Sequence, residues 1–136
     1  MHHLNRASRY FYKPHAGLLL LRLVTGYIFI EHGWMKVQNL AMATGMMMHF
    51  GMPGWVGVFI AWLEVIGGLA LILGILVRPF AVALGIEMVV AVFLTGFGRG
   101  MMPHDLEIVL ALNSFALALA GAGRFALLSI FEHHER

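Results

Sequence analysis

The sequence contains no cysteine and few charged residues. Without a thiol, the chain cannot form disulfides, perform thiolate catalysis, hold a cysteine-ligated cluster or attach a c-type haem covalently. Only 12% of the residues are charged, against roughly 25% in soluble domains, and 60% are hydrophobic. The formal net charge of +2 is small, and no dense Lys/Arg face is present, which argues against a nucleic-acid partner.

The most informative stretch is 16–37, AGLLLLRLVTGYIFIEHGWMKV. It has the length of a membrane-spanning helix, which needs about 20 mostly apolar residues. It nevertheless contains Arg22, and a charge within the bilayer costs at least ~2.5 kcal/mol on insertion scales. The Arg22 side chain must therefore face protein or water. Because the apolar run continues past signal-peptide length with Arg22 inside it, we do not expect a cleavable signal.

At 136 residues we expect one domain, a four-helix transmembrane bundle of the all-α class. The predicted spans are 16–35, 55–77, 80–97 and 105–121. A polar, basic and interfacial segment precedes them at 1–15, and a polar tail follows at 122–136. The first and second spans are joined by a methionine-rich loop, the second and third by a tight link at Arg78-Pro79, and the third and fourth by a Gly/Pro/Met turn.

The basic residues outside the spans predict the orientation, because cytoplasmic loops carry an excess of Lys and Arg. With the N-terminus inside, six basic residues fall on the inner side and two on the outer side. The inner six are Arg6, Arg9, Lys13, Arg78, Arg124 and Arg136, and the outer two are Lys36 and Arg99. Both termini are therefore expected in the cytoplasm of a multi-pass membrane protein.

Each charge within a predicted span shares a helical face with small residues, at spacings of three, four and seven. Small residues let helices approach closely in lipid, so these faces are expected to point into the bundle. Gly and Ala are frequent enough here that chance alignment is the alternative. The faces are Arg22 with Gly26 and Gly33; Glu64 with Gly57, Ala61 and Gly68; Glu87 with Ala83, Ala91 and Gly98; and Glu107 with Ala111, Ser114, Ala118 and Gly121.

We predict an interior polar network of Arg22, Glu64, Glu87 and Glu107. Counting residues from the inner ends of their spans places Arg22 and Glu87 at similar depth, as a buried pair. Glu64 falls near mid-membrane with only Arg22 as a plausible cation, and an acid without a firm partner is a candidate for handling a proton. A structural hydrogen bond that fixes helix packing is an equally good interpretation of Glu64.

The outer end of the bundle is predicted to hold His32, Lys36 and Asp105 around its mouth. His32 is the only histidine within a predicted span, which excludes a transmembrane bis-histidine haem. It could relay protons or bond a quinone carbonyl, although an interfacial hydrogen bond is the simpler interpretation. Glu31 lies on the face opposite Arg22 and is expected at the outer interface.

Methionines crowd the first outer loop, where thioether and imidazole groups suit Cu(I). The candidate set is Met46, Met47, Met48 and His49. No fixed ligand spacing supports a copper site, and methionine also serves as a flexible apolar filler. We therefore predict no metal and favour a loop that caps the bundle or dips into the interface.

The order of these residues resembles the DoxX family of bacterial membrane proteins. Arg22, Gly26, His32-Gly33 and Lys36 resemble the pattern of its first helix. The second-helix signature is matched by Glu64-Val-Ile-Gly67-Gly68, Gly74 and Arg78. Glu107 fits the acid that opens the fourth helix, and Gly121-Ala-Gly123-Arg124 resembles the closing glycine motif. One departure is Phe125-Ala-Leu-Leu-Ser129, where the family often has an aromatic-Ser-Leu-Asp ending.

The resemblance implies a four-helix membrane protein linked to quinone-dependent oxidoreductases. The favoured function is an accessory subunit of a quinone-linked membrane redox system, with no intrinsic cofactor, quinone as the candidate ligand and an oxidoreductase subunit as the candidate partner. A proton-coupled carrier or a membrane protein that binds lipid or a small molecule is one alternative. A structural or assembly protein is another, and self-association is left open. Whether the chain is itself an enzyme stays undecided.

Overall fold

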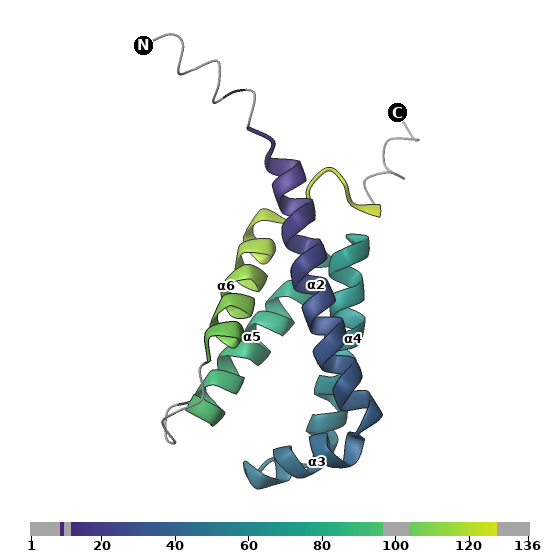
Figure 1. Cartoon of the computed structure of the whole chain (residues 1–136), viewed down its shortest axis with the longest axis vertical. Helices are drawn as coiled ribbons and strands as arrows, with labels where there is room; N and C mark the ends of the chain where they lie inside the picture. Colours follow the sequence, from purple (N-terminus) through teal and green to yellow (C-terminus); the bar gives the residue numbers. More distant parts are fainter. Residues whose placement is uncertain (1–8, 10–11, 97–103, 128–136) are drawn as a thin grey trace.

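The computed structural model describes residues 9, 12–96 and 104–127, and all regular structure among them is helical. The helices in chain order are α2 (Pro14–Gln38), α3 (Leu40–His49), α4 (Trp55–Leu73), α5 (Val77–Gly96) and α6 (Asp105–Ala120). Figure 1 shows α2 and α4 side by side, α5 and α6 as a second pair, and α3 lying at one end. The all-α prediction is confirmed.

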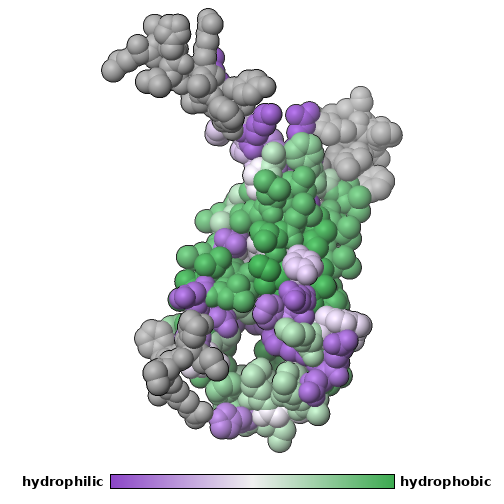
Figure 2. Space-filling model, viewed as in Figure 1, coloured by the Kyte–Doolittle hydropathy of each residue, from purple (hydrophilic) through white to green (hydrophobic). Residues whose placement is uncertain are grey.

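Three of the described helices, α2, α4 and α5, are long and apolar enough to cross a membrane. Their outer surface is apolar over the middle of the molecule, as the green band in Figure 2 shows. The protein is thus a helical membrane bundle. Helix α6 has 16 residues, and its bounds, Asp105–Ala120, nearly match those of the predicted fourth span, 105–121. The count of four spans and the orientation of the termini stay predictions.

Helices α2 and α4 pack backbone to backbone along their glycines. A Cβ atom built on Gly26 would lie 2.5 Å from the Gly68 carbonyl oxygen, and one built on Gly68 would lie 2.5 Å from the Gly26 carbonyl oxygen. A Cβ on Gly33 would lie 2.8 Å from the Ala61 carbonyl oxygen. The residue numbers of the contacting positions increase along α2 and decrease along α4, so the two helices are antiparallel. The small-residue faces of Arg22 and Glu64 are therefore confirmed as a helix interface.

The apolar core lies where α5 and α6 meet α2 and α4. Its fully buried members include Phe29, Leu71, Leu84 and Leu117. Figure 1 shows the α5–α6 pair diverging from the α2–α4 pair toward the end occupied by α3. The core therefore fills one end of the bundle, and the other end is left wider.

The predicted second span, 55–77, is too long by several residues. Helix α4 ends at Leu73 because Gly74 adopts a left-handed conformation with φ 76°, and its N–H bonds to the Ala70 carbonyl. Helix α5 begins at Val77, so the predicted Arg78-Pro79 link lies inside its first turn. Proline is tolerated there because the first N–H groups of a helix have no intrahelical acceptor.

The predicted first outer loop contains a helix, α3, that the sequence reading missed. The side chain of Asn39 caps it by accepting from the Met42 N–H at 3.1 Å. Asparagine before a helix-favouring run is a recognised start signal and could have revealed α3. Gly98, Arg99 and most of the predicted segments 1–15 and 122–136 lie outside the described residues.

Candidate functional site

The buried guanidinium of Arg22 lies away from every acid of the predicted network. It donates to four backbone carbonyl oxygens at 2.7 to 3.2 Å. The acceptors belong to Leu71 and Ile72 in the last turn of α4, and to Ala122 and Phe125 after α6. The predicted pair of Arg22 with Glu87 is wrong. The last carbonyls of a helix lack intrahelical partners and form its negative end, so they can satisfy a buried cation.

The acids meet Lys36 instead. Its ammonium donates to Glu64 Oε1 at 2.6 Å, and Glu87 Oε1 lies 4.0 Å from the same nitrogen. The side chains are 21%, 1% and 9% exposed for Lys36, Glu64 and Glu87. These three residues, from α2, α4 and α5, are called the charge cluster below. Counting residues along the spans predicted Arg22 as the only plausible cation for Glu64 and as the partner of Glu87. Both predictions are wrong, because Lys36 lies beside both acids.

Side-chain direction explains the pairing of Lys36 with Glu64. Side chains on an α-helix lean toward the N-terminus of that helix. In antiparallel helices these directions oppose each other. The Lys36 side chain leans toward the middle of α2 and that of Glu64 leans toward the α3 end of the bundle, so both converge on one level between α2 and α4.

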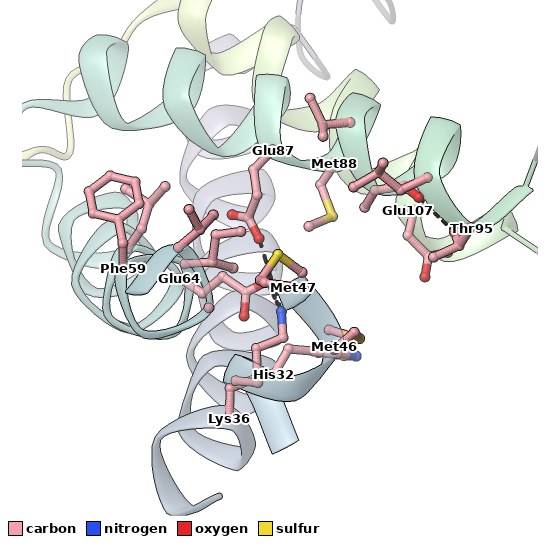
Figure 3. A pocket seen from close by; sticks show the side chains of 18 of the residues that line it. His32, Lys36, Met46, Met47, Phe59, Glu64, Glu87, Met88, Thr95 and Glu107 are labelled. Carbon is pink, nitrogen blue, oxygen red and sulfur yellow. Dashed lines mark hydrogen bonds and ion pairs between the residues drawn. The ribbon is translucent and has the colours of Figure 1, made fainter. Parts of the chain in front are cut away.

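The charge cluster forms part of the wall of a cavity of about 570 Å³. This volume falls within the roughly 300–1,000 Å³ of ligand pockets. All of the described helices from α2 to α6 contribute to the wall, which is mostly apolar. The polar and charged lining residues are His32, Lys36, Glu64, Glu87, Thr95 and Glu107. Figure 3 shows Glu64, Glu87 and Lys36 converging from three helices.

Three carboxyl oxygens of the cavity are buried without a hydrogen-bond partner in the described part of the chain. They are Oε2 of Glu64, Glu87 and Glu107. A buried acceptor left without a donor costs about 1–3 kcal/mol, and more when it is charged. The wall therefore presents unused acceptors to whatever occupies the cavity.

Of the three residues predicted around the outer mouth, the structure brings two together in the cavity wall. His32 lines the cavity, and its Nδ1 lies 2.8 Å from the Ile28 carbonyl oxygen, which leaves Nε2 for another partner. Lys36 lines it too, whereas the exposed Asp105 does not. Glu31 is exposed, in agreement with its predicted position on the face opposite Arg22, and its location at the outer interface stays a prediction.

The structure also adds residues that sequence reasoning missed. Thr95 lies on the wall, donates to the Ala91 carbonyl at 2.6 Å and lies 3.4 Å from His104 Nδ1. Met52 and Met88 line the cavity as well. A lone threonine and scattered methionines carry no sequence signal that would have singled them out.

The four copper candidates do not converge. Met46 and Met47 line the cavity, whereas Met48 and His49 are exposed and lie outside its wall. Consecutive residues on α3 point in different directions around the helix, so they cannot all reach one ion. Of the two alternatives for the methionine-rich segment, capping the bundle agrees with the position of α3 at the end of the α2–α4 pair (Figure 1), and dipping into the interface stays a prediction.

Comparison with known sequences identifies relatives. The model of the family described as DoxX matches residues 17–96. The chain is 32% identical over 112 residues to "Putative oxidoreductase CatD" of Bacillus subtilis (strain 168), covering 82% of this chain and 84% of CatD. It is 28% identical over 115 residues to "Inner membrane protein YqjF" of Escherichia coli (strain K12), covering 82% and 88% of the two chains.

An uncharacterized protein of Haemophilus influenzae is 32% identical over 127 residues, covering 85% of this chain and 90% of that one. No solved structure matches the chain. The matched region 17–96 contains all three members of the charge cluster, whereas Glu107 lies beyond it.

Proposed function

The chain belongs to the DoxX family of membrane proteins, and on that basis we propose that it is an accessory subunit of a quinone-linked redox system in the bacterial inner membrane. Its own task is to hold a quinone-type ring in the cavity. In this role, electrons are supplied and removed by a partner oxidoreductase. The chain has no cysteine with which to hold an iron–sulfur cluster.

The observation that carries this proposal is a charge cluster set in the wall of an otherwise apolar cavity. Ligand sites combine an apolar lining with a few placed polar groups that orient the ligand. An ionisable group within a membrane is costly and marks a functional site by default. The proposed role and location agree with the names "Putative oxidoreductase CatD" and "Inner membrane protein YqjF".

Purification from native membranes in mild detergent tests the proposal. Mass spectrometry of the purified protein should find a membrane quinone and a flavin- or metal-containing oxidoreductase. The Lys36→Met variant should retain the oxidoreductase and lose the quinone-type ligand, because Glu64 in the cavity wall is then left without its counter-charge. Glu31→Gln, which changes an exposed acid outside the cavity, is the matched control. Recovery of neither quinone nor oxidoreductase with the wild-type protein contradicts the proposal.

A second candidate function is a small proton-coupled carrier. It is favoured by two carboxyls that flank one ammonium inside a membrane bundle, an arrangement found in proton relays. Liposomes containing the protein and a pH-sensitive dye would report proton movement coupled to uptake of a small solute. A pH gradient that drives no uptake in the wild-type protein, with Glu64→Gln indistinguishable from it, removes this candidate.

A further inference from the structure

We propose that the cavity is loaded from the bilayer, through an opening between α4 and α5, by a lipid-soluble molecule whose ring carries hydroxyl donors. This inference rests on the proposed function and adds to it the chemical class of the ligand and the route of entry. Phenols and hydroquinones share this chemistry. The arguments concern the opening, the acceptors and the apolar lining.

Exposed lining residues mark an opening between α4 and α5, and Met46 of α3 and Leu106 of α6 are lining residues that are exposed as well. Phe59 of α4 is 57% exposed, and Ile86 and Val90 of α5 are 53% and 44% exposed. All three lie within candidate membrane spans. Large apolar side chains that reach both the cavity and the outer surface mark a mouth that faces acyl chains. A lipid-soluble molecule can therefore enter sideways.

The connection between α4 and α5 explains why the opening lies there. Gly74 to Val77 joins the two helices by a tight turn at the end of the molecule that holds Arg22. Away from this turn the helices diverge toward the α3 end (Figure 1). Glu64 and Glu87, which line the cavity, lie in this diverging part of the two helices.

The wall presents more acceptors than donors. The ammonium of Lys36 already donates to Glu64 Oε1, while Oε2 of Glu64 and of Glu87 are buried and lack a partner. Glu64 is 1% exposed, so its free oxygen cannot turn to water outside the cavity. A hydroxyl of the ligand can donate to these oxygens, and hydrogen bonds to a carboxylate are stronger than neutral ones.

A ring that offers only carbonyl oxygens leaves the same carboxyl oxygens without a donor. A ligand that carries a carboxylate would add negative charge beside Glu64, Glu87 and Glu107, and placing like charges together is unfavourable. The cavity therefore selects for hydroxyl donors over ethers and acids, and for the hydroquinone form of a quinone-type ring over its quinone form.

The rest of the wall suits an aromatic ring. Phe29 and Leu63 contribute apolar surface, and Met47 and Met88 place thioethers on the wall. Thioether sulfur makes favourable contacts with aromatic rings. Figure 3 shows the side chains of Met47 and Met88 near the carboxyl group of Glu87.

A matched set of ligands tests the donor requirement. The wild-type protein in nanodiscs is offered a decyl-substituted 1,4-hydroquinone, its dimethyl ether and the corresponding 1,4-quinone, under anaerobic reducing conditions for the hydroquinone. The retained ligand is quantified against empty nanodiscs. We expect the hydroquinone to bind at least about tenfold more tightly than the dimethyl ether, since an unsatisfied buried acceptor costs on the order of 1.4 kcal/mol.

Glu87→Gln replaces one acceptor oxygen by an amide donor of the same shape. It should reduce the preference for hydroquinone over quinone by about tenfold. Glu31→Gln, on the exposed face of α2, should leave the preference unchanged. Equal binding of hydroquinone and dimethyl ether by the wild-type protein overturns the donor requirement. So does a preference that Glu87→Gln leaves unaltered in a variant that remains folded by circular dichroism.

A pair of tryptophan variants tests the route. Ile86→Trp narrows the opening, whereas Val82→Trp adds the same ring one turn earlier on α5, at a residue that is 41% exposed and does not line the cavity. Loading of the decyl hydroquinone from donor vesicles should slow at least about fivefold in Ile86→Trp only, because the added ring occupies the mouth. Equal rates for the two variants overturn lateral entry.

The membrane and the aqueous phase are distinguished as sources of the ligand by comparing the decyl hydroquinone with unsubstituted 1,4-hydroquinone, which has the same donors and no tail. Stronger retention of the tailed compound identifies the membrane pool, and equal retention identifies a free phenol; equal retention also overturns the lipid-soluble ligand.

The proposed function and this inference can fail independently of each other. Hydroquinone binding without a co-purifying oxidoreductase would refute the accessory role and keep this inference. Tight binding of the dimethyl ether, with an oxidoreductase that co-purifies, would refute this inference and keep the accessory role.

Discussion

Lys36 in the last turn of α2 and Glu64 in the middle of α4 form an ion pair of 2.6 Å. Arg22, which the sequence pairs with an acid, is satisfied by backbone carbonyls at the other end of the bundle. The two cations therefore have separate tasks. Lys36 belongs to the cavity, and Arg22 ties the ends of helices together.

Replacing Lys36 by Met should destabilise the protein by about 3 kcal/mol, because removing one partner of a buried ion pair leaves an uncompensated charge. The change is measured as the free energy of unfolding in detergent. The double variant Lys36→Met with Glu64→Gln should regain at least half of the loss, since the stranded carboxylate is then gone. A double variant less stable than Lys36→Met would contradict the assigned pair.

Replacing Arg22 by Lys should destabilise the bundle by about 2 kcal/mol even though the charge is kept. A single ammonium cannot reach four carbonyls that the planar guanidinium spans. Limited proteolysis should then cut more readily after α6, where Ala122 and Phe125 lose their donor. Arg9→Lys, at an exposed position, is the control. Unchanged proteolysis in Arg22→Lys would refute the tethering role.

Replacing Gly26 by Ala should weaken the α2–α4 pair by about 1–3 kcal/mol, because the added Cβ would meet the Gly68 carbonyl and force the helices apart. Gly17 lies on the same helix with no atom within 4 Å of an added Cβ. Gly17→Ala should instead stabilise the protein by about 0.5 kcal/mol through helix propensity. Thermal unfolding in one detergent compares the two variants, and equal effects would show that the glycine contact is not needed.

Single cysteines test the predicted orientation, since the chain has none of its own and gives no background. Gly45→Cys on α3 should react with a membrane-impermeant maleimide in intact cells. Tyr12→Cys, at a residue 78% exposed before α2, should react only after permeabilisation. The reverse pattern would place the N-terminus outside and turn the cavity toward the cytoplasm.

The sequence was sufficient to predict several features of this protein. Long apolar runs interrupted by a few charges require a membrane bundle, because only helices satisfy their own backbone in lipid. The acids had to lie inside, and Glu64, Glu87 and Glu107 all line the cavity. The small-residue faces of Arg22 and Glu64 correctly located the α2–α4 contact. Each of these features depends on local composition or on helical periodicity.

The tertiary structure decided which charges meet. Counting residues along separate spans gives depth, but it does not give the lean of a side chain, the early end of α4 at Gly74 or the helix α3 beside the cavity. These features place Lys36 beside Glu64 and Glu87 and leave Arg22 to the carbonyls. The physical reason is that a buried charge takes the partner its side chain can reach, and reach depends on the direction and packing of neighbouring helices.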